Sequence, residues 1–136
     1  MSSRGAPPLS MGLQVAKLKY RFPGFQYVPR ENALYGFLQP THASAEYWVK
    51  LVYTLKRPPK VWVLRPELHP DARRLHRYSD GSLCLYHPLD DNWRSDLFLA
   101  DTIVPWAAEW LYCYECWLLD PDHHWPGPEA PHAGRK

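Results

Sequence analysis

Residues 78–86 read Tyr-Ser-Asp-Gly-Ser-Leu-Cys-Leu-Tyr, and the interpretation of the whole chain starts from this stretch. The Asp80-Gly81 pair predicts a tight turn, because glycine adopts a positive φ without steric cost. Cys84 follows the turn and stands between two leucines. A cysteine among apolar residues is often only a small buried side chain. The stretch alone therefore leaves two interpretations of Cys84, a core residue or a reactive thiol.

The segments before this turn have the alternation typical of β-strands. Residues 47–55 place apolar side chains at every second position, the period of a half-buried strand. Residues 35–39 and 60–64 predict two further strands, the second directly after the stiff Pro58-Pro59 pair. Because the links between these strands are short, we expect them to form an antiparallel meander. Residues 66–78 lack periodicity and lead to Cys84, so this loop can fold over the thiol.

Two segments have the periodicity of helices. Residues 9–21 predict a short N-terminal helix that ends at Phe22-Pro23-Gly24. Residues 96–119 repeat apolar side chains at helical spacing, with Thr102 in the position of an N-cap. Large aromatic residues recur along this second helix, and we predict that they face the sheet as part of the core: Trp106, Trp110 and Trp117.

Length and composition limit the classes of protein to be considered. A chain of 136 residues fits one domain with one core, which we place at residues 9–136 after a disordered N-terminus of residues 1–8. A formal charge of +2 and no basic stripe argue against a nucleic-acid partner. We find no membrane span and no secretory signal pattern. The three cysteines do not form a disulfide pattern, so we expect a cytoplasmic protein.

Four features occur in the order found in ubiquitin-conjugating enzymes. They are Pro-Pro-Lys-Val at 58–61, Tyr-x-Asp-Gly-x-x-Cys-Leu at 78–85, Trp93, and the helix start Thr102-Ile103. From about residue 35 to about residue 119 the chain resembles that superfamily. It is most similar to the short bacterial conjugating-enzyme-like proteins of CBASS anti-phage operons. That closer resemblance rests on three runs: Leu-Cys-Leu-Tyr at 83–86, the aromatic helix of residues 105–117, and Trp-x-Gly…Pro-His at 125–132.

The resemblance implies a fold and a nucleophile. The fold is α/β (α+β), of the ubiquitin-conjugating-enzyme type, with an antiparallel meander sheet and helices, and truncated at the C-terminus relative to members that charge ubiquitin. Cys84 corresponds to the catalytic cysteine, whose thiolate is a strong nucleophile and whose thioester stays reactive. Cys113 and Cys116 are expected to be core or helix-surface residues.

His76 is the second predicted catalytic residue. The superfamily carries His-Pro-Asn before its cysteine, and fixing the register at Tyr78 aligns residues 74–76 with that motif. His76 then stands where the family has asparagine, which orders the loop and helps to stabilise an oxyanion. An imidazole can donate a hydrogen bond there, and it can also accept a proton. Both roles remain open at this point.

The resemblance also implies a partner and an activity. The expected activity is that of a thioester-forming, conjugating-type acyltransferase acting on the C-terminus of the CBASS cyclic-oligonucleotide synthase, a cGAS-like nucleotidyltransferase, in the regulation of anti-phage signalling. Partner contacts are assigned to Tyr78, Tyr86, Trp93 and His132. No adenylating domain and no phosphate-binding glycine loop is visible, so ATP chemistry has to come from elsewhere or be bypassed.

Two other functions remain possible, and a metal site is not expected. The chain can be a binding module for a partner's tail in which Cys84 is not catalytic, or a Cys-His thioester hydrolase in which His76 activates Cys84. Cys113-x-x-Cys116 followed by His123-His124 has the residue types of a zinc site. Because both cysteines lie within a tryptophan-rich helix, we assign them to packing and predict neither a metal nor a cofactor.

Overall fold

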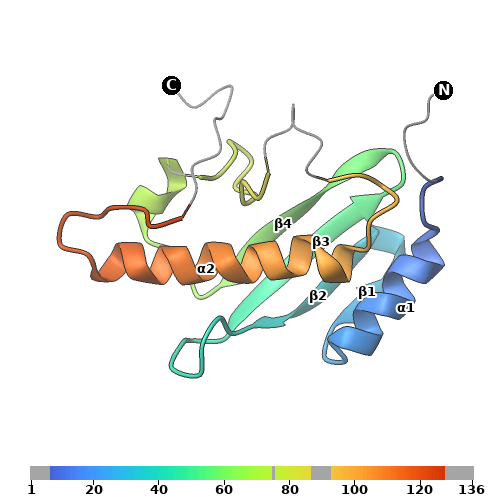
Figure 1. Cartoon of the computed structure of the whole chain (residues 1–136), viewed down its shortest axis with the longest axis horizontal. Helices are drawn as coiled ribbons and strands as arrows, with labels where there is room; N and C mark the ends of the chain where they lie inside the picture. Colours follow the sequence, from blue (N-terminus) through green and yellow to red (C-terminus); the bar gives the residue numbers. More distant parts are fainter. Residues whose placement is uncertain (1–6, 75, 87–92, 128–136) are drawn as a thin grey trace.

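The computed structural model describes residues 7–74, 76–86 and 93–127 (Figure 1). Four strands form one antiparallel sheet in the order β1-β2-β3-β4. The helix α2 crosses one face of this sheet, and α1 lies beside the β1 edge. The predicted α+β meander fold is therefore confirmed. The elements are α1 (Met11–Arg21), β1 (Gln26–Val28), η1 (Pro29–Glu31), β2 (Ala33–Leu38), β3 (Tyr47–Thr54), β4 (Arg57–Arg65), η2 (Pro70–Arg74), η3 (Leu99–Asp101) and α2 (Ile103–Leu119).

The strand β3 is the centre of the core. Its residues alternate between buried and half-buried along the whole strand, as the sequence predicts. The buried side faces α2: Val49 and Leu51 of the strand and Val104 and Ala107 of the helix belong to one core cluster and line the same small space between the layers. Removing a side chain such as Val49 or Leu51 from water contributes about 1.5–3 kcal/mol, so this layer between sheet and helix is a large source of stability.

Two strands differ from the sequence-based prediction. β4 begins at Arg57 and includes Pro58 and Pro59, whereas the sequence predicts a strand from residue 60. β4 forms one edge of the sheet, where a proline without an N–H group is tolerated. The additional strand β1 has only three residues, too few for an alternating pattern. Next to it the ring of Phe25 lies against Gly36, where any side chain would clash with that ring.

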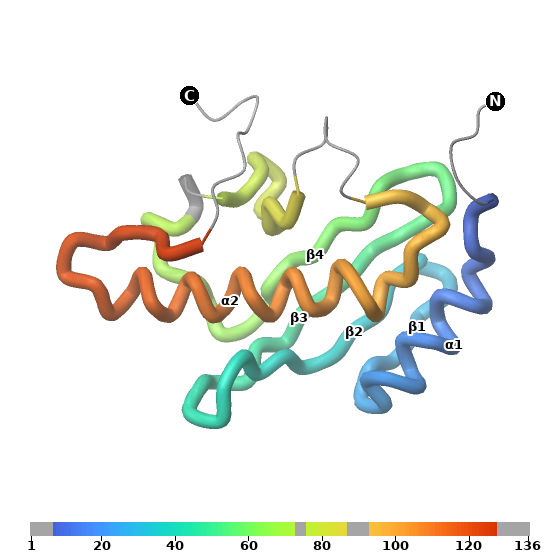
Figure 2. Tube along the Cα trace, in the orientation of Figure 1, coloured from blue at the N-terminus to red at the C-terminus, as the bar shows by residue number. Residues whose placement is uncertain are grey.

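The helix α2 is buried on two sides, which corrects the predicted direction of its tryptophans. Trp110 and Trp117 are core residues, with 5% and 2% of their surface exposed. Besides stacking on Tyr114 of the same helix, however, their rings contact the segments that flank α2: Trp110 packs on Trp125, and Trp117 packs on His69 and His123. Figure 2 shows the segments after β4 and after α2 along the same side of the helix. Helical spacing alone does not distinguish a sheet-facing ring from a loop-facing one.

The two helices begin differently, one with a side-chain cap and one without. Ser10 caps α1 by accepting a hydrogen bond from the Leu13 N–H at 3.1 Å. Thr102 occupies the N-cap position of α2, as predicted, but its hydroxyl donates to the Phe98 carbonyl at 2.8 Å instead of capping the helix. In the described part of the chain, no helix is long and apolar enough to cross a membrane.

Candidate functional site

The predicted turn forms, and it organises the segment that carries Cys84. We call residues 76–86 the Cys84 loop. The Gly81 N–H donates to the Tyr78 carbonyl and the Tyr78 N–H to the Ser82 carbonyl, each at 2.9 Å. Gly81 has φ +89°, a conformation that a residue with a side chain rarely adopts. Arg77 and Leu83 form an antiparallel bridge, so the loop doubles back like a short hairpin.

Asp80 stabilises the turn from within. Its carboxylate accepts hydrogen bonds from the Ser82 N–H at 2.9 Å and the Ser82 hydroxyl at 2.6 Å, and from Lys60 of β4 at 2.6 Å. Partial burial acts to raise the pKa of Asp80, but these hydrogen bonds and the Lys60 charge outweigh it and lower the pKa to about 2. The carboxylate therefore stays ionised and keeps the turn closed at neutral pH.

The Cys84 loop is attached to the edge strand β4 at several points. The Leu83 N–H donates to the Val61 carbonyl at 2.8 Å. The indole N–H of Trp62 donates to the Asp80 carbonyl at 3.0 Å. The Tyr86 hydroxyl donates to the Pro59 carbonyl at 3.3 Å. Because these contacts lie along the whole loop, the edge of the sheet fixes its position.

On its other side the loop is attached to α2 through His76. The His76 carbonyl accepts the Cys84 N–H at 2.8 Å and the indole N–H of Trp110 at 3.0 Å. His76 has φ +60°, in the left-handed region where histidine and asparagine are more common than most residues. Its imidazole is 3% exposed and stacks on Trp125, with the ring centroids 4.2 Å apart. The main chain of His76 thus adjoins Cys84, and its ring belongs to an aromatic cluster.

The Cys84 thiol lies in a polar setting with two tyrosines. Cys84 is 7% exposed, and its Sγ lies 4.0 Å from the Tyr86 carbonyl oxygen, at the limit of a weak S–H hydrogen bond. The Tyr78 hydroxyl donates to the same oxygen at 3.1 Å. Burial and then a hydrogen bond with Cys84 raise the pKa of Tyr78. Burial and then the neighbouring Cys84 raise the pKa of Tyr86 to about 12.

The other two predicted partner contacts are Trp93 and His132. Trp93 packs edge-on against Tyr53 of β3, with centroids 5.2 Å apart, and its buried indole N–H has no hydrogen-bond partner among the described residues. His132 lies outside the described residues, as does Leu75 of the motif register. Of the residues assigned to the partner, Tyr78 and Tyr86 are therefore the ones found beside Cys84.

The other two cysteines belong to α2. Cys113 is buried and faces Gly127, where an added Cβ would come too close to the sulfur. Burial, then Glu109 and Cys116, raise the pKa of the Cys113 thiol, which favours the unreactive protonated form. Within the described ranges, the side chains that gather with metal-ligand spacing are instead Asp120, Asp122 and His124. Asp120 accepts hydrogen bonds from the backbone of the other two, as expected for a turn.

Trp125 has contacts that the sequence does not predict. This residue follows α2, and its ring contacts both His76 and Trp110. The sequence does place Trp125 in the Trp-x-Gly run shared with the resembled family. That run does not indicate which residues the Trp125 ring contacts. The segment after α2 is thereby packed against the residue that precedes the Cys84 loop turn.

Comparison with known proteins supports the resemblance. A family model described as "Type II CBASS E2 protein" matches residues 14–133. The match includes the sheet, the Cys84 loop and α2. A search of curated proteins finds no match.

Proposed function

This chain belongs to the type II CBASS E2 protein family, and on that premise we propose that it transfers an acyl group through Cys84. Membership gives a CBASS-associated, E2-like role. The proposed activity is that of a conjugating-type transferase that binds the C-terminus of the CBASS cyclic-oligonucleotide synthase, a cGAS-like nucleotidyltransferase, and links it to an acceptor. This activity would regulate anti-phage signalling.

The observation that best supports the proposal is the attachment of the Cys84 loop on both sides of the thiol. The Leu83 N–H bonds to Val61 of the sheet, and the Cys84 N–H bonds to His76, which Trp110 of α2 holds in turn. When the fold already holds a nucleophile in a fixed position, less entropy is lost on the way to the transition state, and the reaction is faster. Cys113 and Cys116 lie on a helix whose contacts are those of packing.

The proposed reaction begins with an activated C-terminal carboxyl group, an acyl adenylate or a thioester made by a separate activating protein. The Cys84 thiolate attacks the carbonyl carbon, a C–S bond forms, and AMP or a thiol leaves. The Cys84 proton passes to water or to a base. We further propose that His76 assists as a hydrogen-bond donor to the oxyanion or as that base.

Partner binding is proposed for the aromatic residues near the thiol. Tyr78 and Tyr86 flank Cys84, so a tail that delivers its carboxyl terminus to the sulfur would pass over them. Trp93 and His132 complete the proposed partner contacts. Cys84, Cys113 and Cys116 form no disulfide, which fits a reducing compartment such as the cytoplasm.

Intact-mass analysis tests this function. The protein is mixed with the purified synthase, an activating protein and ATP, and the covalent product is treated with hydroxylamine or with a reductant. We expect an adduct of the two masses minus one water that hydroxylamine releases. Release by reductant alone indicates a disulfide, and a transient adduct that yields the free synthase tail indicates a hydrolase. Non-covalent association without an adduct indicates the binding module.

A further inference from the structure

Two hydrogen-bond donors in the Cys84 loop converge on one acceptor. The Tyr78 hydroxyl donates to the Tyr86 carbonyl oxygen at 3.1 Å, and the Cys84 thiol reaches the same oxygen at 4.0 Å. The Tyr78 hydroxyl and the sulfur thus both lie next to one oxygen, and a hydrogen bond between the two side chains is among the causes of the raised pKa of Tyr78. A good O–H hydrogen bond is much stronger than a weak contact from S–H, so in the thiol form the carbonyl belongs mainly to Tyr78.

The situation changes when Cys84 loses its proton. A thiolate is an acceptor, and the partial negative charge of the Tyr86 carbonyl does not stabilise it. The Tyr78 hydroxyl can turn about its C–O bond and donate to the sulfur instead. Burial and the hydrogen bond with Cys84 raise the pKa of Tyr78, so its proton stays on the oxygen when the thiolate forms.

Two other ionisable groups near this pair, Tyr86 and Asp80, are already engaged in hydrogen bonds. The Tyr86 hydroxyl directs its proton to the Pro59 carbonyl at 3.3 Å. The Asp80 carboxylate is bound by Lys60 and Ser82. Asp80 acts on Tyr78 only as the weakest of the charges that raise its pKa. Tyr78 is therefore better placed than Tyr86 or Asp80 to respond to the charge on the sulfur.

We propose that Tyr78 stabilises the Cys84 thiolate by donating a hydrogen bond to it, and so sets how readily this thiol reacts. This role differs from the partner contact that the sequence assigns to Tyr78. It deepens the proposed function and rests on it, since a stabilised thiolate is useful only if Cys84 is a nucleophile. The hydrogen bond itself is a property of the protein alone.

The test is the pH dependence of Cys84 alkylation by iodoacetamide, followed by peptide mass spectrometry from pH 6 to 9.5 without a partner. A hydrogen bond to a charged group is worth about one pKa unit or more, so Tyr78→Phe should raise the midpoint by about one unit. At pH 7 the alkylation rate of Tyr78→Phe should fall about three- to tenfold. The fraction of thiolate falls about tenfold, and the higher nucleophilicity of a more basic thiolate offsets part of this loss. Tyr35→Phe is the matched control and should leave the midpoint in place, because the Tyr35 hydroxyl donates to Glu31, away from the Cys84 loop.

Two results would overturn the proposal. An unchanged midpoint in Tyr78→Phe would show that the phenol does not stabilise the thiolate. Faster alkylation would show that Tyr78 only closes the loop. If Cys84 reacts too slowly for alkylation, thiolate absorbance near 240 nm, taken as the difference from Cys84→Ser, gives the same midpoint. A shifted midpoint in a protein that forms no adduct with the synthase would leave this inference standing and remove the proposed function.

Discussion

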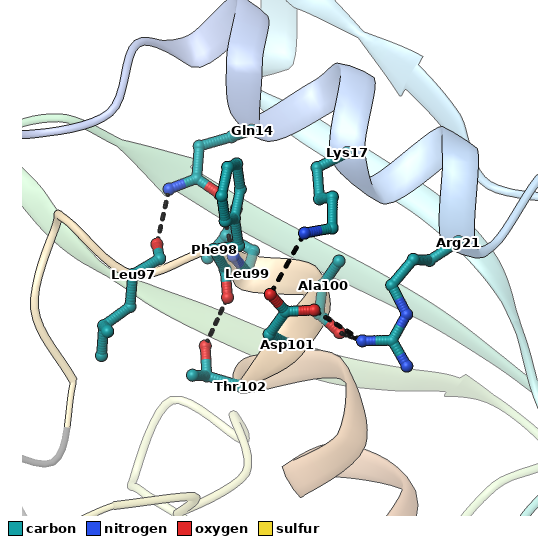
Figure 3. Close-up of polar contacts among 9 residues, drawn as sticks. All are labelled: Gln14, Lys17, Arg21, Leu97, Phe98, Leu99, Ala100, Asp101 and Thr102. Atoms are coloured by element: carbon teal, nitrogen blue, oxygen red, sulfur yellow. Dashed lines mark hydrogen bonds and ion pairs between the residues drawn. The ribbon is translucent and has the colours of Figure 1, made fainter.

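Two polar assemblies join distant parts of this chain, and the hydrogen bonds of their central side chains, Gln14 in one and Tyr78 in the other, differ in how acceptors are used. The first, which we call the α1–η3 joint, connects Gln14, Lys17 and Arg21 to residues 97–101 (Figure 3). Gln14 is completely buried; its amide oxygen accepts the Leu99 N–H and its amide nitrogen donates to the Leu97 carbonyl, both at 2.8 Å. Each polar group of this side chain has its own partner.

In the Cys84 loop, by contrast, acceptors are shared. The Tyr86 carbonyl is approached by Tyr78 and by Cys84, and the His76 carbonyl accepts from both Cys84 and Trp110. A buried amide with one partner for each group has no alternative arrangement, so it fixes structure. A donor that shares an acceptor can change partner when the sulfur changes charge. Changes in the joint should therefore alter stability alone, and changes in the loop should alter thiol chemistry.

The largest expected effect is on Trp110, which connects the core to the loop. Trp110→Ala should lower the free energy of unfolding by about 3–5 kcal/mol, because it removes a buried indole and the hydrogen bond to His76. Denaturant unfolding measures this loss. The matched control is Tyr112→Ala on the same helix, where the side chain is 49% exposed and the change should stay within about 0.5 kcal/mol. Equal stability of the two variants would contradict the two-sided burial of α2.

His76 should affect the reaction. If it donates to the oxyanion, His76→Ala slows adduct formation on the order of 10²–10³-fold, and His76→Asn retains it. Asparagine also tolerates the positive φ at this position. If His76 is a base, asparagine does not rescue, and the parent rate rises with pH through the titration of the imidazole, a transition that both variants lose. Indistinguishable pH profiles for the three proteins would remove His76 from the chemistry.

A change at Gln14 should lower stability and leave the thiol chemistry unchanged, the opposite of what is expected for His76. Gln14→Ala leaves the Leu97 carbonyl and the Leu99 N–H without partners, which should lower the free energy of unfolding by about 2–3 kcal/mol. The alkylation rate of Cys84 should not change. Gln26→Ala, at an exposed position of β1, is the control and should be close to neutral. A changed Cys84 rate in Gln14→Ala would show that the two assemblies are coupled.

The smallest expected effect concerns Asp80 and acid. The pKa of Asp80 in the folded protein is about 2, below its value in the unfolded chain. The ionised carboxylate therefore makes its full contribution to the free energy of unfolding above about pH 4. This contribution is lost as the pH falls towards about 2. Because the side chain is 39% exposed, solvent screening limits this contribution to less than about 1 kcal/mol.

Unfolding measured between pH 6 and 2 tests that expectation. The parent should lose more stability than Asp80→Asn over the acid range. Asp71→Asn, which changes an exposed carboxylate of η2, should follow the parent. Parallel curves for Asp80→Asn and the parent would show that the ion pair with Lys60 does not stabilise the turn.

The sequence predicts what depends on local pattern. The alternation of β3, the Asp80-Gly81 turn and the N-terminal helix are all confirmed. It does not predict contacts between segments far apart in the chain. The stacking of Trp125 on His76 and the hydrogen bonds of Gln14 in the α1–η3 joint can be found only once the complete fold is known. The helix α2 illustrates this limit. Its apolar residues follow one periodic pattern, but some of them face the sheet and others face the segments that flank the helix.

Adduct formation by single-cysteine variants tests most directly the central claim that Cys84 carries the acyl group. Cys84→Ala, Cys113→Ala and Cys116→Ala are each mixed with the synthase, its activating protein and ATP, and their intact masses are measured. We predict no hydroxylamine-sensitive adduct for Cys84→Ala, and adducts at the parental level for the other two. A parental amount of adduct on Cys84→Ala, or its loss only in a variant of α2, would contradict the claim.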